Sequence, residues 1–359
     1  MTILLLADSN AATYACTLLA NELSHQGLEC LVVATQIGIE NSPLPAIPPG
    51  LGRVPQLQFS LKELLLSSLI HRAKAVGAFL HASKIGPFVQ GYRQICQLHG
   101  QSPAPVFSGP VFPLGGDTLI ADLLPRLCCD LLCLHGQRQL EEARDLMHRW
   151  PDPVPTVALG FWFMPEAPED GGLVGAGTPQ PPHTLVVLTQ AGLPNLPGAR
   201  ARMLRLLGEK ASASPHWRVL IQPDHSLPTG RLPLDAETSD KKKLPPNLSF
   251  AAAANLPLIL GRCSACLSLS SPWIFTAMAW GRPVLVMGDH GITTNQGSAP
   301  FFGSGVMGRL DALADLDELL ERPRANWGWL ERMGWGVHDG ATQLACALQA
   351  MAEAEAPLP

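Results

Sequence analysis

Two adjacent serines, Ser270 and Ser271, have the placement in this chain that most clearly suggests chemistry. The apolar run 265–269 before them has the length of a buried parallel strand, and Pro272 after them suits the first turn of a helix. Both hydroxyls would then lie between the end of a strand and the start of a helix expected over 273–280, with Ser271 as the helix cap. Hydroxyls and unpaired N–H groups that converge on one place bind anions, so this spacing predicts a phosphate site.

Three further side chains could take part in proton transfer. Asp8 follows the first predicted strand, and Asp117 lies at a glycine-rich turn between a strand and a helix. Either carboxylate could act as a general base, or could only cap the helix that follows it. His225, after the strand expected over 217–222, could donate a hydrogen bond to a substrate phosphate or could face solvent.

A glycine-rich segment, FFGSGVMG, covers residues 301–308. Gly303, Ser304 and Gly305 could turn backbone N–H groups toward a bound anion, or could form an ordinary turn. The sequence therefore gives two candidate anion-binding segments within about 50 residues, since the serine pair lies only about 30 residues earlier.

These segments together resemble a known family. The serine pair, the helix after it, the GRPV run, Gly288-Asp289-His290-Gly291 and FFGSGVMG are similar to the C-terminal half of a bacterial family classed as GT-B-type glycosyltransferases. The serine pair is also similar to that of bacterial sialyltransferases and polysialyltransferases, in which paired serines hold the phosphate of a CMP-sugar.

The resemblance implies an α/β, GT-B-like fold of two Rossmann-like domains, whose parallel sheets face a central cleft. It also implies that a nucleotide sugar is bound by the serine pair together with Asp289, Gly291, Gly303, Ser304 and Gly305. Two departures from the family pattern are visible. Thr276 stands where many GT-B enzymes carry a glutamate for the donor ribose, and Gln222 and Asp224 supply no cation beside His225.

Composition restricts the other classes of function. A chain of 359 residues exceeds one compact core, and its 15% of charged residues is below the ~25% usual for soluble domains. A net charge of −5 argues against a nucleic-acid partner. Nine scattered cysteines and an N-terminus without signal-peptide features favour free thiols in the cytoplasm. No metal motif such as D-x-D and no G-x-G-x-x-G is present, so we expect neither a metal nor a dinucleotide cofactor.

Two similar strand-and-helix series are separated by residues 161–183, which are rich in proline and glycine and lack apolar periodicity. This pattern predicts an N-terminal, acceptor-side domain over 1–165 and a C-terminal, donor-binding domain over 166–359. The resemblance implies that the terminal helix, expected over 341–355, can return to the first domain.

Residues 53–93 carry a local surplus of positive charge against one acid, Glu63. The basic residues are Arg53, Lys62, Arg72, Lys74, Lys84 and Arg93. Because apolar residues recur at helical spacing over 61–81, we expect these cations to share one surface. That surface could face an anionic acceptor or the inner membrane surface, or could be only a solvated helix face.

The sequence thus predicts a glycosyltransferase that moves a sugar from a nucleotide-sugar donor to a cell-surface glycan or glycolipid acceptor without a metal. We expect the protein in the cytoplasm, with peripheral membrane contact through residues 53–93 as a further option. Two alternatives remain: a nucleotide-sugar epimerase of the same fold, and a non-catalytic protein that binds nucleotide sugars.

Overall fold

The computed structural model describes residues 2–35, 54, 56–167, 183–190, 193–194, 198–222, 244–251, 256–293 and 297–354. The chain divides into two compact units. Unit 1 comprises Met1–Pro165 and Glu331–Pro359, and unit 2 comprises Glu166–Leu330. Residues 331–359, which the sequence pattern placed in the second domain with a possible return of the last helix, therefore group with unit 1.

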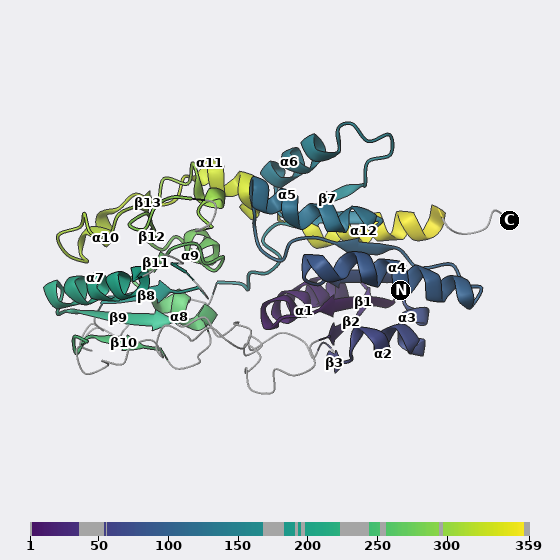
Figure 1. Ribbon diagram of the computed structural model, residues 1–359, viewed down its shortest axis with the longest axis horizontal. Helices are drawn as coiled ribbons and strands as arrows, with labels where there is room; N and C mark the ends of the chain where they lie inside the picture. The colour runs from purple at the N-terminus through teal and green to yellow at the C-terminus, as the bar shows by residue number, and fades with distance from the viewer. Residues whose placement is uncertain are drawn as a thin grey trace. The chain divides into compact units, whose positions relative to one another are not determined.

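The described part of unit 1 is built on a seven-stranded parallel sheet in the order β3-β2-β1-β4-β5-β6-β7 (Figure 1). Its strands are β1 (Thr2–Ala7), β2 (Glu29–Ala34), β3 (Gln56–Gln58), β4 (Ala75–Phe79), β5 (Val106–Ser108), β6 (Leu131–Leu134) and β7 (Thr156–Ala158). Its helical segments are α1 (Asn10–His25), α2 (Leu61–Leu66), α3 (Ser68–Arg72), α4 (Ala82–Leu98), α5 (Asp117–Leu123), η1 (Leu124–Cys128), α6 (Gln137–Met147), η5 (Glu331–Trp335) and α12 (Gly340–Ala354). The central strands are apolar runs buried on both faces, as parallel sheets require.

The described part of unit 2 is built on a six-stranded parallel sheet in the order β10-β9-β8-β11-β12-β13. Its strands are β8 (His183–Leu188), β9 (Trp217–Gln222), β10 (Leu248–Phe250), β11 (Ala265–Ser268), β12 (Val284–Met287) and β13 (Met307–Gly308). Its helical segments are α7 (Ala199–Ala213), α8 (Leu256–Arg262), α9 (Ile274–Ala279), η4 (Ala299–Phe301), α10 (Glu318–Glu321) and α11 (Trp327–Leu330). The expectation of two Rossmann-like units with parallel sheets is confirmed.

Each sheet has a point at which the strand order reverses. In unit 1 the first strand, β1, lies between β2 and β4, and in unit 2 the first strand, β8, lies between β9 and β11. The loops that leave β1 and β4 therefore diverge to opposite sides of the sheet, as do those that leave β8 and β11. Ligands of open parallel sheets bind at such switch points, beyond the carboxyl ends of the strands.

Two helix predictions were wrong in extent. The stretch 61–81 is not one helix, because the run AVGAF is fully buried and forms the central strand β4 after the short helices α2 and α3. Apolar residues at helical spacing over 310–320 also favour a helix, but only the last residues of that stretch are helical, in α10. Apolar residues at helical spacing occurred in both stretches, but burial on two sides of a sheet and tight turns decided the structure.

The C-terminal segment returns to unit 1 through close backbone contact. Gly160 has φ +70°, and a Cβ there would overlap the carbonyl oxygen of Val337, while a Cβ at Gly340 would overlap the carbonyl of Leu159. Helix α12, yellow in Figure 1, then lies along β7 and α1. Glycine is required where two backbones approach this closely.

Within the described residues, no helix is both long and apolar enough to cross a membrane.

Candidate functional site

The serine loop lies at the switch point of unit 2. Ser268, the last residue of β11, donates its hydroxyl proton to the carbonyl of Leu188 at 2.9 Å and accepts the N–H of Ser271 at 2.8 Å. Ser268 thereby joins the ends of β8 and β11 and fixes the backbone of the loop that follows. Ser268, predicted from the sequence only as part of a strand, therefore holds the loop in place.

Ser270 links the same two loops by its side chain. Its hydroxyl donates to Oε1 of Gln190, at 2.5 Å, and only 8% of its surface is exposed. Gly297 packs against Ser270, because a Cβ at position 297 would lie only 2.7 Å from Ser270 Oγ. Gly297 also has φ +70°. The loops after β8, β11 and β12 therefore meet at Ser270.

The predicted cap of the following helix is wrong. Helix α9 begins at Ile274, one residue later than expected, and no side chain caps it. The N–H groups of Ile274 and Phe275 donate to the carbonyls of Ser271 and Pro272 in a turn. Those N–H groups are therefore not free to bind an anion. The polar side chains of the loop are the better candidates for that role.

The position expected for ribose recognition is closed. Thr276 is completely buried, and its Oγ1 has no hydrogen-bond partner among the described residues. Its hydroxyl faces the protein interior, so a ribose would have to be recognised by other groups.

Arg202 supplies a cation at this edge that was not predicted from the sequence. It lies in the first turn of α7, which begins after the loop from β8, and its side chain is exposed. Cations are unfavourable in the first turn of a helix, where the dipole is positive, and that placement was a signal available from the sequence. Arg202 stands close enough to His290, in the loop after β12, for its charge to affect that imidazole.

His290 lies beside Arg202 and was mentioned above only as part of the motif Gly288-Asp289-His290-Gly291. Burial lowers its pKa most, Asp289 opposes this, and the charge of Arg202 lowers the pKa further. Its Nε2 is buried and has no hydrogen-bond partner among the described residues. The imidazole of His290 and the exposed guanidinium of Arg202 thus lie near each other at the carboxyl edge of the sheet of unit 2.

Other predicted donor-binding residues have local structural roles. Both carboxylate oxygens of Asp289 are occupied, one by the N–H of Leu310 at 2.8 Å and the other by that of Asp311 at 2.9 Å. Ser304 is completely buried, and its Oγ accepts the N–H of Val306. Neither side chain faces a ligand in this arrangement.

The predicted glycines do have open backbones. Gly291, Gly303 and Gly305 are exposed, with φ of +93°, +85° and +79°. Left-handed backbone of this kind exposes main-chain N–H groups, so these three positions remain candidates for ligand contact.

In unit 1, Asp8 lies at the switch point beside β4. Its Oδ2 accepts the N–H of His81 at 3.0 Å and the ammonium of Lys84 at 2.7 Å, and its side chain is 7% exposed. The cap of α1 is Ser9, whose hydroxyl accepts the N–H of Ala12. The alternative role of Asp8 as a cap for that helix is therefore wrong.

Asp117 is the exposed first residue of α5, where Gly116 and not Asp117 occupies the cap position. It lies at the carboxyl edge of the same sheet, after β5. His225 lies outside the described residues, and so does Arg53.

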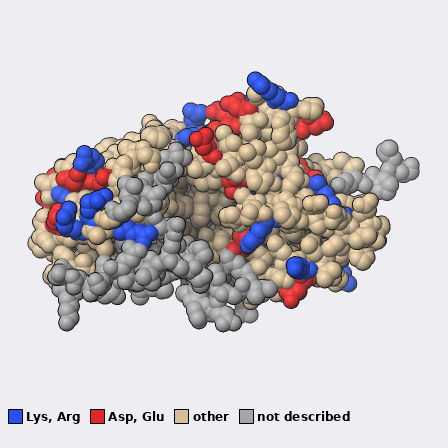
Figure 2. All heavy atoms as spheres, in the orientation of Figure 1, with Lys and Arg blue, Asp and Glu red and all other residues tan. Residues whose placement is uncertain are grey.

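Two of the six basic residues expected to share one surface are paired with acids in the described part of the chain. Lys84 pairs with Asp8, while Arg93 pairs with Asp130 at 2.7 Å. Lys62, Arg72 and Lys74 are exposed on or next to α2 and α3. On the face shown in Figure 2, basic side chains gather beside acidic ones over unit 2 and are more widely spaced over unit 1. The helical pattern that suggested one surface was broken by strand β4.

No group of three or more His, Cys, Asp or Glu side chains in the described part of the chain is arranged to hold a metal ion.

Solved structures share the whole fold at low sequence identity. S. aureus MnaA in a co-structure with UDP has a TM-score of 0.66 and 9% identity, over 100% of this chain and 98% of that chain. The UDP-GlcNAc 2-epimerase from Neisseria meningitidis, bound to UDP-GlcNAc, has a TM-score of 0.58 and 13% identity, over 98% and 100%. The calicheamicin glycosyltransferase CalG4 has a TM-score of 0.53 and 15% identity, over 99% of both chains. These similarities show the GT-B fold.

No curated protein is similar enough in sequence to count as a relative of this chain. A family model does match, and it covers residues 3–349, nearly the full length. The chain therefore belongs to the family described as "Putative glycosyltransferase (DUF6716)".

Proposed function

We propose that this protein is a glycosyltransferase that binds a nucleotide sugar at the switch point of unit 2 and transfers the sugar to a glycan or lipid-linked acceptor. The observation that carries the proposal is the link from Ser270 to Gln190, which joins the two diverging loops by a buried hydroxyl. This is where parallel α/β sheets bind ligands, and family membership supports the transferase class.

The chemistry of the site suits a phosphate. The Ser270 hydroxyl has one proton, so it would turn from Gln190 to a phosphate oxygen, and the amide NH₂ of Gln190 could donate beside it. Ser271 offers a second hydroxyl from the same loop. Arg202 would offset the charge of the leaving nucleotide. The sequence offered no cation for this role near His225.

The nucleotide sugar is supported by structures of the same fold. Two of them contain UDP or UDP-GlcNAc, and we extend only the class of ligand to this chain. Asp8 and Asp117 are the two candidates for the base that deprotonates the acceptor hydroxyl. Oδ1 of Asp8 has no hydrogen bond among the described residues and could accept that proton, while Oδ2 is held by Lys84.

Binding is tested with a double alanine variant of the serine pair. A thermal-shift screen of CMP-, UDP- and GDP-sugars would first identify a donor. Hydrogen bonds to charged groups contribute about 1.5–3 kcal/mol each, so every lost bond should weaken binding roughly 10- to 150-fold in isothermal titration. Ser249→Ala, on the exposed side of the short strand β10, is the matched control and should bind as the parent does. Unchanged affinity in a folded double variant would overturn the site.

Epimerases share this fold, so the reaction class needs its own measurement. A transferase releases the nucleotide and forms a glycoside with an acceptor, whereas an epimerase returns an isomeric nucleotide sugar without one. Mass spectrometry and NMR of the products distinguish the two. A non-catalytic binder would give neither product while still binding the donor.

A further inference from the structure

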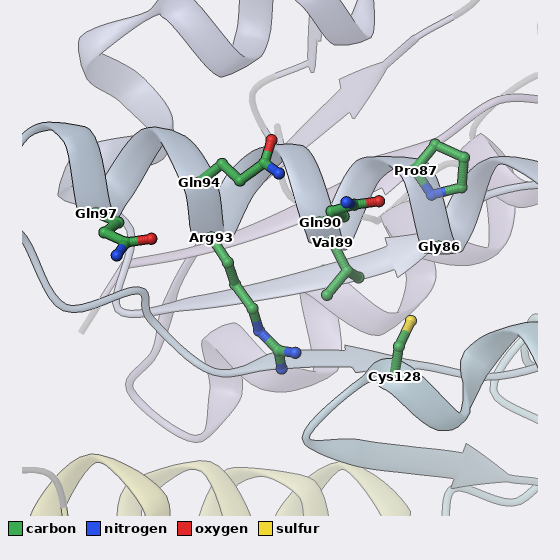
Figure 3. A pocket seen from close by; sticks show the side chains of 8 residues that line it. All are labelled: Gly86, Pro87, Val89, Gln90, Arg93, Gln94, Gln97 and Cys128. Carbon is green, nitrogen blue, oxygen red and sulfur yellow. The ribbon is translucent and has the colours of Figure 1, made fainter.

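A groove of about 510 Å³ lies between α4 and η1 on unit 1. It is lined by Gly86, Pro87, Val89, Gln90, Arg93, Gln94, Gln97 and Cys128, so its largely apolar wall carries the side-chain amides of three glutamines. Figure 3 shows the Cys128 sulfur directed toward α4, with the Arg93 side chain reaching from that helix toward the segment that carries Cys128. A half-buried thiol thus forms part of a groove whose lining includes three side-chain amides.

Cys128 and its neighbour Cys129 form a pair of interacting thiols. The Cys129 thiol donates a hydrogen bond to Cys128, and this is the main reason why the pKa of Cys128 falls to about 7. Burial opposes that shift, the Cys128 backbone and the charge of Arg93 support it, and Asp130 opposes it. The same hydrogen bond and burial raise the pKa of Cys129, with Arg126 opposing, so Cys129 stays protonated as the donor.

The other seven cysteines differ from Cys128. Six are buried, namely Cys16, Cys30, Cys96, Cys133, Cys263 and Cys266. Burial raises the pKa of each of these six thiols. The seventh, Cys346 on α12, is exposed and provides a reference thiol within the same chain.

We propose that Cys128 is a site of reversible modification, at which its thiolate attacks a small-molecule disulfide lying in the α4 groove. The Cys128 sulfur forms a bond to one sulfur of that molecule, the original S–S bond breaks, and the second half leaves as a thiolate. The disulfide is the only oxidant required. The amides of Gln90, Gln94 and Gln97 suit a molecule with peptide bonds, such as the disulfide of a thiol-containing peptide, while the Arg93 guanidinium is held by Asp130.

The pH dependence of the reaction tests the thiol. Glutathione disulfide is the probe, and peptide mapping by mass spectrometry gives the rates at Cys128 and Cys346 in one sample. Relative to an ordinary thiol with a pKa near ~8.5, a thiol with a pKa near 7 gains in thiolate fraction at low pH. The rate at Cys128 divided by the rate at Cys346 should therefore fall roughly 20-fold from pH 6 to pH 9. A difference in accessibility between the two thiols affects the rate ratio equally at every pH, so it does not affect the change of the ratio with pH. A ratio that stays constant would overturn the proposal.

Two sets of variants separate the thiol pair from the groove. Cys129→Ala removes the hydrogen-bond donor to Cys128, so the rate ratio should change less with pH. An unaltered pH profile would mean that the hydrogen bond from Cys129 does not cause the low pKa of Cys128. The rate at Cys128 should saturate with glutathione disulfide, and Gln90→Ala with Gln94→Ala should raise the half-saturating concentration. A rate that is strictly linear in disulfide would mean that the groove binds nothing. Cys128→Ser, checked for folding by circular dichroism, should lose this reaction and leave that of Cys346 unchanged.

Discussion

Asp8, directly after β1, and Lys84, in the first turn of α4 after β4, form an ion pair of 2.7 Å at the point where the strand order of unit 1 reverses. Asp8 is almost fully buried, whereas Lys84 is 46% exposed. In unit 2, Ser270 and Gln190 occupy the corresponding position, at the ends of β11 and β8. Each unit therefore carries a polar contact between side chains at the place where ligands of this architecture bind.

Replacing Asp8 by Asn tests whether its carboxylate is the acceptor base. The amide keeps the size of the side chain but cannot take a proton, so the turnover rate should fall by about 10²- to 10⁴-fold with donor affinity unchanged. Asp117→Asn is the parallel variant and should retain activity if Asp8 is the base. Lys84→Met controls for the loss of the ion pair. An Asp8→Asn enzyme with normal turnover would leave Asp8 with a structural role alone.

Arg202→Met should weaken binding of the donor by roughly 10-fold or more, because a charge-assisted contact to phosphate is lost. The binding constant should also depend less on salt, since one screened attraction is removed. Titrations at low and high ionic strength measure both effects. Arg218→Met removes the same charge at an exposed position of β9 and should alter neither the affinity nor its salt dependence. Equal effects of the two variants would mean that the net charge of the protein, and not a contact of Arg202, attracts the donor.

His135 should make unit 1 less stable in acid. It is completely buried, its Nδ1 lies 2.8 Å from the carbonyl oxygen of Gly160, and burial lowers its pKa from the ordinary 6.5 to about 4. Between these values the unfolded chain binds a proton that the folded chain does not, so stability rises with pH in this window. The contribution lost between pH 7 and pH 5 is about 2 kcal/mol.

Urea unfolding at the two pH values measures this loss. His135→Gln should lower stability overall but flatten its dependence between pH 5 and pH 7. His148→Gln, at an exposed position of the same unit, should keep the slope of the parent. The prediction fails if His135→Gln and the parent lose the same free energy on acidification.

Gly160→Ala should loosen the return of the C-terminal segment. Alanine is strained at φ +70°, and its Cβ would also overlap the carbonyl oxygen of Val337. Gly100→Ala is the matched control, because Gly100 has φ +64° with open space around it. The overlap should add about 1–3 kcal/mol to the strain that both variants share. Hydrogen exchange at the amides of α12 should accelerate in Gly160→Ala and remain slow in Gly100→Ala.

The sequence predicted the sheets better than the site. Strands β1, β8, β9, β11 and β12 are short apolar runs bounded by polar or glycine residues, so their period and length were visible. Strand β4 escaped notice because its small residues extended a helical pattern from the preceding segment.

The roles within the site depended on partners distant in the chain. Ser268 accepts the N–H of Ser271, no side chain caps α9, and both oxygens of Asp289 are taken by backbone more than 20 residues later. Such hydrogen bonds leave no local pattern in the sequence. Arg202 did leave one, as a cation in the first turn of a helix.

The return of residues 331–359 makes unit 2 an insertion within unit 1. The two ends of the interrupted unit lie close together, since the rings of Phe161 and Trp335 are 6.3 Å apart. During synthesis on the ribosome, unit 2 is therefore complete and continuous before unit 1 has received α12, which covers β7 and α1. Unit 2, which comes second in the sequence, can therefore fold first. Part of the sheet of unit 1 stays uncovered until the last residues emerge from the ribosome.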